Sequence, residues 1–224
     1  MEARTASSQH RALIESWFPF EAVGAESLRD ASAARKPPLN RLHVWWARRP
    51  LTVSRAAILA SVLPEWSAEW PVPLRGKFPT AEAYRAWFLR LIGILGDPVA
   101  GRRLIQWANE RGVKLEERPY GGAPRAFTVN PAPEDLETMR DLLEFAWGTR
   151  EIAVMDPMAG GGSIPFEALR YGFTTYANEL NPVASVVLKA TLDYPARFGP
   201  SLVEDIRHWG NVWAERVRER LAEF

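Results

Sequence analysis

Cysteine is absent from the 224 residues of this chain. The absence excludes disulfide bonds, zinc sites built on thiolates and cysteine nucleophiles, and it fits a reducing compartment such as the cytoplasm. Long apolar runs are missing as well. No stretch approaches the roughly 18 apolar residues of a membrane span, and the N-terminus lacks the apolar core of a secretory signal. We therefore expect a cytoplasmic protein that does not act in a membrane.

Charge of one sign is not in excess either, since 28 basic residues face 27 acidic ones and the formal net charge is +1. Such a balance neither predicts nor excludes a nucleic-acid partner, because a local basic patch can be hidden in a balanced total. Hydrophobic residues make up 47% of the chain and charged residues 25%, which is typical of a globular protein. The length allows one domain, or one domain with a sizeable insertion.

Metal-site spacings are missing too. No His and Glu residues have the spacing of a zinc site, and no aspartate cluster resembles a metal site, so we predict no bound metal. His10 and His208 have no supporting neighbours in the sequence. We interpret both histidines as surface residues.

Proline-rich stretches divide the chain into three segments. Residues 1–64 are predicted to form an N-terminal helical region with a proline-rich turn at residues 34–40. Residues 65–149 are predicted to form a mainly helical insertion, in which residues 125–130 (RAFTVN) favour a strand. Residues 150–224 are predicted to begin a domain in which strands and helices alternate.

Several helix boundaries are marked by residues that commonly start or stop helices. One helix is expected between Pro50 and Pro64. Two further helices are expected on either side of residues 96–98, the first starting at Thr80 and the second stopping at Gly112.

The third segment alternates apolar strand patterns with helix patterns. Residues 151–156 (EIAVMD) and 173–180 (FTTYANEL) favour strands, and residues 163–172 (SIPFEALRYG) favour the helix between them. A helix is expected to start at Pro182. Residues 201–224 are predicted to form a long charged helix whose alternating charges are typical of a solvated or partner-contacting face. Strand, glycine loop, helix and strand open a doubly wound sheet, so we expect an α/β, Rossmann-like fold with an incomplete sheet.

A glycine-rich loop, DPMAGGG at residues 156–162, joins the first of these strands to its helix. Backbone N–H groups at a helix N-terminus attract polar ligands, and glycine lets a ligand come close. A dinucleotide fingerprint starting at Gly160 would need glycine where Pro165 stands, and a phosphate-binding P-loop would need a lysine that is absent. Both phosphate-binding patterns therefore fail.

Two acids flank this loop unit. Asp156 ends the first strand, and Glu179 ends the second strand 23 residues later, close to the spacing at which an acid meets a ribose in such folds. A carboxylate at the second position can accept hydrogen bonds from both ribose hydroxyls, and the acid at the first position can address an amino group. A nucleoside joined to an amino acid without phosphate suits this arrangement, and S-adenosylmethionine is such a molecule.

The same residues resemble known motifs. DPMAGGG followed by ANELNP is similar to the first and second cofactor motifs of amino-group DNA methyltransferases, in which D-P-F-x-G-x-G precedes an acid and Asn-Pro. Met158 replaces the usual phenylalanine. The resemblance implies that residues 150–224 are the first part of an S-adenosylmethionine-binding domain. The implied cofactor-binding residues are Asp156, Pro157, Met158, Ala159, Gly160, Gly161, Gly162, Glu179 and Asn181.

A second dense motif, HVWWARRPL at residues 43–51, is here named the Trp–Arg stretch. Adjacent indoles and guanidiniums suit stacking on bases and binding of phosphate or carboxylate, although a core-anchoring Trp pair with surface arginines is equally compatible with the composition. Residues 13–64 are similar to the N-terminal region of a family of large proteins described as adenine-specific DNA methylases, whose N-terminal domain has no assigned function and carries H-x-W-W-A-R-R-P-L. The candidate contact residues are His43, Trp45, Trp46, Arg48 and Arg49.

This resemblance leads to a specific hypothesis. In many amino-methyltransferases a loop and helix before the glycine loop complete the pocket around the methionine end of the cofactor. We therefore expect Arg48 or Arg49 to reach the cofactor carboxylate or a DNA phosphate.

The acceptor motif of amino-methyltransferases, [DNS]-P-P-[YF], is missing from this sequence, so no catalytic residue is predicted. We expect the chain to be the cofactor-binding front of an adenine-specific DNA methyltransferase, inactive alone. Its expected partners are DNA and either a C-terminal half or a complementary subunit. The resemblance also implies a role in restriction or phage defence. A non-catalytic subunit that binds DNA or a partner, and an RNA methyltransferase, remain alternatives.

Overall fold

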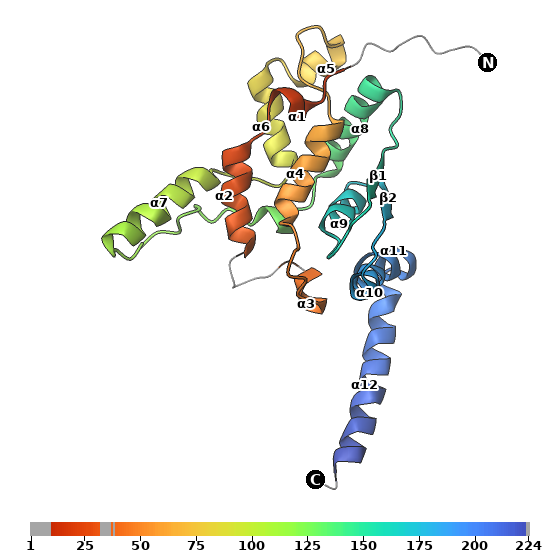
Figure 1. Ribbon diagram of the computed structural model, residues 1–224. Helices are drawn as coiled ribbons and strands as arrows, with labels where there is room; N and C mark the ends of the chain where they lie inside the picture. The colour runs from red at the N-terminus through yellow and green to blue at the C-terminus, as the bar shows by residue number, and fades with distance from the viewer. Residues whose placement is uncertain (1–9, 32–36, 38, 223–224) are drawn as a thin grey trace, which may run out of the picture.

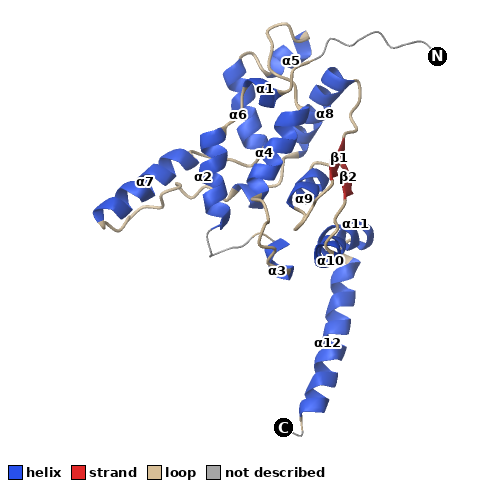
Figure 2. Ribbon diagram, in the orientation of Figure 1, coloured by secondary structure: helices blue, strands red, loops and turns tan. Residues whose placement is uncertain are grey.

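The computed structural model describes residues 10–31, 37 and 39–222, and within them a mostly helical chain carries one small parallel sheet (Figure 1). Figure 2 shows the two short strands among the helices. The strands are β1 (Ala153–Asp156) and β2 (Thr174–Ala177), a 3-10 turn covers Ala126–Thr128, and a π-helical turn covers Lys189–Asp193. The α-helices are α1 (Leu13–Ser16), α2 (Phe20–Ala31), α3 (Leu39–Leu42), α4 (Leu51–Val62), α5 (Val72–Lys77), α6 (Ala81–Leu91), α7 (Pro98–Arg111), α8 (Pro133–Trp147), α9 (Ser163–Arg170), α10 (Pro182–Leu188), α11 (Tyr194–Phe198) and α12 (Ser201–Leu221).

The predicted helix boundaries are confirmed by the local hydrogen bonds. The Thr80 hydroxyl accepts the Ala83 N–H at 3.2 Å at the start of α6, and Gly112 ends α7 with a φ of 62°. Helix α4 begins after Pro50 and ends before Pro64. These residues act within one turn of chain, so their effect can be recognised without the tertiary fold. The predicted turn at residues 34–40 lies largely outside the described residues.

One hydrophobic core joins all three sequence segments. Helix α4 packs against α1, α2 and α9, so the N-terminal region holds the helix that follows the glycine loop. The core contains Leu13 and Leu59 from the first segment, Tyr84 and Phe88 from the second, and Phe173 from the third. The position of the glycine loop is therefore determined by packing against helices that precede it by about a hundred residues.

The sheet is confirmed as two parallel strands. Ala153 lies opposite Thr174, and α9 packs against both β1 and β2. On the other face, Met155 and Tyr176 are 67% and 59% exposed. Parallel sheets are usually covered on both faces, so this face is a surface on which further structure can pack. The finding supports an α/β arrangement.

A fully buried ion pair fastens α9 to the N-terminal helices. Arg55 of α4 and Glu167 of α9 are both 0% exposed, and the Arg55 Nε donates to the Glu167 Oε2 at 2.7 Å. The Arg55 Nη1 donates at 3.0 to 3.1 Å to the carbonyl oxygens of Ile92, Ala126 and Val129. One guanidinium thus links α4, the chain after α6, the 3-10 turn and α9.

The predicted strand at residues 125–130 is wrong. Residues Ala126–Thr128 form a 3-10 turn whose backbone groups are paired with side chains from elsewhere. The Ala126 N–H donates to the Glu26 carboxylate at 2.8 Å, and the Ala126 carbonyl accepts from Arg55. These bonds take up backbone groups that a strand ladder would need, so distant side chains override the local preference of the sequence.

Helix α12 leads away from the rest of the molecule (Figure 1). None of its described residues is buried. Its apolar side chains recur at helical spacing along one side and include Leu202, Ile206, Trp209, Trp213, Val217 and Leu221. The interpretation of this helix as a solvated or partner-contacting element stays a prediction.

The two isolated histidines have different surroundings. His208 is exposed beside the Trp209 ring, as expected of a surface residue. His10 is partly buried, and its ring centroid lies 4.6 Å from that of Phe145. The surface interpretation is therefore wrong for His10, because its ring packs on α8.

Two features are not found in the part of the chain that the structure describes. No helix there is long and apolar enough to cross a membrane. No group of three or more His, Cys, Asp or Glu side chains there is arranged to hold a metal ion.

Candidate functional site

The glycine loop turns tightly between the carboxyl end of β1 and the N-terminus of α9. The Asp156 carboxylate, at the end of β1, accepts the Met158 N–H at 3.1 Å. Gly160 and Gly162 have φ angles of 51° and 80°, a region that favours glycine. The Gly162 N–H donates to the Ala159 carbonyl at 2.8 Å, and α9 begins at the next residue. The loop therefore lies at the strand ends, where ligands of α/β folds bind.

Glu179 connects the glycine loop to the turn after β2. Its Oε2 accepts the Gly160 N–H at 2.7 Å, and its Oε1 accepts the N–H groups of Leu180 and Asn181 at 2.9 and 3.0 Å. The N–H groups of Asn181 and Gly160 hold the pKa of this carboxyl below its usual range. Each carboxylate oxygen has two lone pairs, so Oε2 keeps one free position for a ligand hydroxyl.

Two asparagines of the second motif organise the same region. The Asn178 carbonyl accepts the Ala159 N–H at 3.0 Å, and its Nδ2 donates to the Pro157 carbonyl at 3.2 Å. Asn181 caps α10, where its side-chain oxygen accepts the Val183 N–H at 2.9 Å. Asn178 was not predicted as a site residue, although its place directly after a strand is a usable signal. A cofactor contact of Asn181 stays a prediction beside this capping role.

Within the glycine loop, residues 157 and 158 are exposed to solvent and residue 159 is buried in the protein. Pro157 is exposed, and Met158 is 82% exposed. Ala159 is buried and packs with Leu188 and Leu192 from the helices after β2. The packing of Ala159 holds the loop against these helices, while the Met158 side chain is accessible to solvent.

The Trp–Arg stretch lies directly on the glycine loop. A Cβ atom added at Gly160 would lie 2.9 Å from the Trp45 Nε1, and one added at Gly161 would lie 2.5 Å from the Arg48 Nε. Any larger residue at either glycine would collide with these side chains. The structure therefore brings together the two motifs that the sequence holds far apart, and the glycines are needed for that contact.

The other members of the stretch contact the loop less. The Arg49 carbonyl accepts the Ser163 hydroxyl at 2.7 Å, which fixes the stretch to the first residue of α9, while Arg49 as a whole is exposed. Trp46 is 88% exposed, and His43 is exposed as well. Of the five predicted contact residues, Trp45 and Arg48 bring their side chains against the loop, whereas His43, Trp46 and Arg49 are exposed.

Arg48 has no counter-ion among the described residues. Its Nη2 donates to the His43 carbonyl at 3.3 Å, whereas its Nε and Nη1 are buried and have no hydrogen-bond partner within the described chain. Burial lowers the pKa of Arg48, and no carboxylate offsets that effect. Buried polar groups are nearly always paired, so this guanidinium is suited to an anionic ligand group.

A cavity of about 180 Å³ lies beside Arg48, between the end of α2 and the start of α4. Asp30 lines it and is only 5% exposed. The Asp30 Oδ2 accepts the Thr52 hydroxyl at 2.9 Å, but the Oδ1 has no partner among the residues that are described. Sequence reasoning missed Asp30, because no local pattern marks it as buried.

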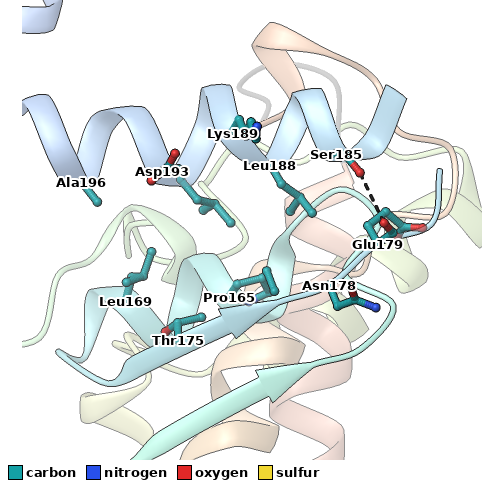
Figure 3. A pocket seen from close by; sticks show the side chains of 12 residues that line it. Pro165, Leu169, Thr175, Asn178, Glu179, Ser185, Leu188, Lys189, Asp193 and Ala196 are labelled. Carbon is teal, nitrogen blue, oxygen red and sulfur yellow. Dashed lines mark hydrogen bonds between the residues drawn. The ribbon is translucent and has the colours of Figure 1, made fainter. Parts of the chain in front are cut away.

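A larger groove of about 500 Å³ runs along the edge of β2 that faces away from β1 (Figure 3). Pro165 and Leu169 of α9 line one side, and Leu188 and Ala196 line the other. Figure 3 shows Glu179 at one end of the groove, and its carboxylate accepts the Gly160 N–H of the glycine loop. Polar side chains line it as well, namely Thr175, Ser185, Lys189 and Asp193. Because the groove follows an unpaired edge of β2 in the described sheet, we interpret it as a surface on which further structure can pack.

Part of the chain matches a known protein family. A family model described as a protein of unknown function (DUF1156) matches residues 17–90, which span α2 to α6 and include the whole Trp–Arg stretch. The chain is thus similar to that family over about a third of its length, ending before the glycine loop. No curated protein and no solved structure matches the chain.

Proposed function

We propose that this protein binds S-adenosylmethionine at the glycine loop and is the cofactor-binding part of a DNA amino-methyltransferase with adenine as its target base. Residues from β1 onward would then begin a Rossmann-like methyltransferase sheet. Two lines support the proposal. The motifs at residues 156–162 and 177–182 resemble those of the enzyme class, and the Trp–Arg stretch packs on the first of them.

The observation that carries the proposal is the unpaired guanidinium of Arg48 against Gly161. A partly buried guanidinium whose Nε and Nη1 are buried and unpaired is unfavourable unless an anion joins it. The carboxylate of the methionine end supplies such an anion, and a guanidinium can hold it by two parallel hydrogen bonds. The earlier hypothesis left Arg48 and Arg49 open as candidates, and Arg48 is the better one because Arg49 is exposed.

The ribose of the cofactor would be held by Glu179. Its Oε2 has one acceptor position beyond the bond from Gly160, and that position lies at the end of β2. Contacts in the protein connect the two proposed sites: Glu179 holds Gly160, and the next residue, Gly161, contacts Arg48. An elongated ligand along the loop can therefore meet both side chains.

S-adenosylmethionine, when bound, supplies an electrophilic methyl group for transfer to an amino nitrogen. The residues of this chain bind and orient it, while a polypeptide that carries the acceptor motif would hold the base. The uncovered sheet face at Met155 and Tyr176 and the open edge of β2 are surfaces to which such a polypeptide can add structure. This protein is therefore proposed to act with a C-terminal half or a complementary subunit.

DNA is proposed to approach the exposed side of the Trp–Arg stretch. Trp46 is 88% exposed and Arg49 is exposed, and both lie beside residues that contact the glycine loop. An exposed indole stacks on a base, and a guanidinium binds a phosphate. RNA offers the same groups, so competition between single-stranded DNA and RNA of one sequence distinguishes the two polymers.

Calorimetric titration with S-adenosylmethionine tests the proposal. We expect saturable binding to the unmodified protein and roughly ten- to a hundredfold weaker binding to Glu179→Gln, because the substitution removes a charged acceptor and places an NH₂ group against backbone donors. NAD is expected not to bind, since the loop lacks the dinucleotide fingerprint.

The matched control is Glu151→Gln, which changes an exposed acid just before β1 and is expected to leave the affinity unchanged. Equal binding of NAD and S-adenosylmethionine, or full affinity in Glu179→Gln, would contradict the proposal. If Glu179→Gln and Glu151→Gln lost affinity equally, the loss would reflect the change in net charge and not a contact of Glu179 with the ligand.

A further inference from the structure

The cavity beside Arg48 carries unpaired groups of opposite charge. Arg48 and Asp30 both line it, and the Arg48 Nε and Nη1 and the Asp30 Oδ1 are buried without a hydrogen-bond partner in the described part of the chain. No ion pair between the two side chains is found there. We infer that this cavity binds the head group of an α-amino acid, with the carboxylate on Arg48 and the ammonium group on Asp30.

Asp30 is suited to hold an ammonium group. It lies near the end of α2 and is held by Thr52 at the N-terminus of α4, so one oxygen is fixed and the other is left for a ligand. The side chain is 5% exposed, and a buried carboxylate without a cation is unfavourable. Burial, the largest cause, raises the pKa of Asp30 to about 6, so the group is mostly charged at neutral pH.

Among the described residues, no cation forms an ion pair with Asp30. Glu26 on its own helix opposes the negative charge, and Arg55 on α4 favours it from a distance, since the Arg55 guanidinium is bonded to Glu167. Arg48 and Arg49 border the cavity from the Trp–Arg stretch. A ligand ammonium group placed in the cavity would supply the missing counter-ion.

The ligand has two possible sources with the same chemistry. One is the methionine end of S-adenosylmethionine, in which case the inference rests on the proposed function and extends the cofactor site from Glu179 through Arg48 to Asp30. The other is a free amino acid. A cavity of about 180 Å³ has room for such a head group, which would replace several water molecules that each occupy about 30 Å³.

Paired ligands test the inference. S-adenosylhomocysteine carries the amino-acid head group, and 5′-methylthioadenosine has the same nucleoside without it. Asp30→Asn is expected to weaken S-adenosylhomocysteine binding about tenfold or more, and to change 5′-methylthioadenosine binding less than twofold. Asparagine keeps an oxygen for Thr52, and Glu21→Gln, an exposed acid on the same helix, is the matched control.

A stability measurement shows that the variant is folded. The folded pKa of Asp30 lies above its unfolded value of 3.8, so the wild-type protein loses stability as pH rises through about 6. Asp30→Asn is therefore expected to unfold at a higher temperature than wild type at pH 7.5, and the gain is expected to vanish near pH 4.

The outcomes separate this inference from the proposed function. If both nucleosides bind and Asp30→Asn weakens neither, or weakens both equally, the inference is wrong while the proposed function stands. If neither nucleoside binds but free methionine does, in a manner that Asp30→Asn abolishes, the cavity is a free amino-acid site and the proposed function is wrong. Binding of none of the three ligands contradicts both.

Discussion

Replacing Arg55 by methionine is expected to lower the free energy of unfolding by about 3–5 kcal/mol. The substitution leaves the Glu167 carboxylate buried at 0% exposure without its cation, and it removes the donor shared by three carbonyl oxygens. For a chain of this size, the melting temperature is expected to fall by roughly 10 °C. Urea unfolding followed by circular dichroism measures the change.

Two further variants show whether the loss of stability comes from the buried ion pair. The exposed ion pair of Lys77 and Asp141 is the control, and Lys77→Met is expected to cost less than about 1 kcal/mol. The double variant Arg55→Met with Glu167→Met is expected to regain part of the loss, because no uncompensated charge is then buried. A loss in Arg55→Met no larger than that in Lys77→Met would show that the buried pair does not fasten α9 to α4.

Replacing Arg48 by methionine is expected to reduce the affinity for S-adenosylhomocysteine by about ten- to a hundredfold. Methionine keeps most of the side-chain length but removes the guanidinium that lies against Gly161, and with it the two unpaired donors. Arg49→Met removes an equal charge at the next residue, which borders the same cavity but is exposed to solvent as a whole. That control is expected to leave cofactor affinity within about twofold and to weaken DNA binding instead.

The pair of variants separates a specific contact from a general loss of positive charge. Equal losses in Arg48→Met and Arg49→Met would contradict the proposed position of the cofactor carboxylate. Unchanged affinity in Arg48→Met would mean that the guanidinium only packs on the loop.

Much of the local structure could be predicted from the sequence, because the determining residues act over a few positions. Thr80, Gly112 and the prolines around α4 mark helix ends within one turn. The strand, glycine loop, helix and strand between Ala153 and Ala177 are marked in the sequence by short apolar runs and by the run of three glycines.

Contacts between residues far apart in the chain could not be predicted from the sequence. The segment at residues 125–130 favours a strand locally, but its backbone is taken up by Glu26 and Arg55, which lie far away in sequence. The burial of Asp30 depends on the packing of α2 against α4, and no neighbouring residue signals it. The sequence marked both the Trp–Arg stretch and the glycine loop as important, yet only the fold shows that Trp45 and Arg48 lie on the loop.

The most direct test of the central claim is an amide and indole NMR titration of the ¹⁵N-labelled protein with S-adenosylhomocysteine. The backbone N–H signals of Gly160 and Gly161 and the indole N–H signal of Trp45 are expected to shift together and to saturate. The indole signals of Trp209 and Trp213, on the exposed helix α12, are expected to stay in place. Saturable shifts confined to α12, or no shift at the two glycines, would contradict binding at the glycine loop.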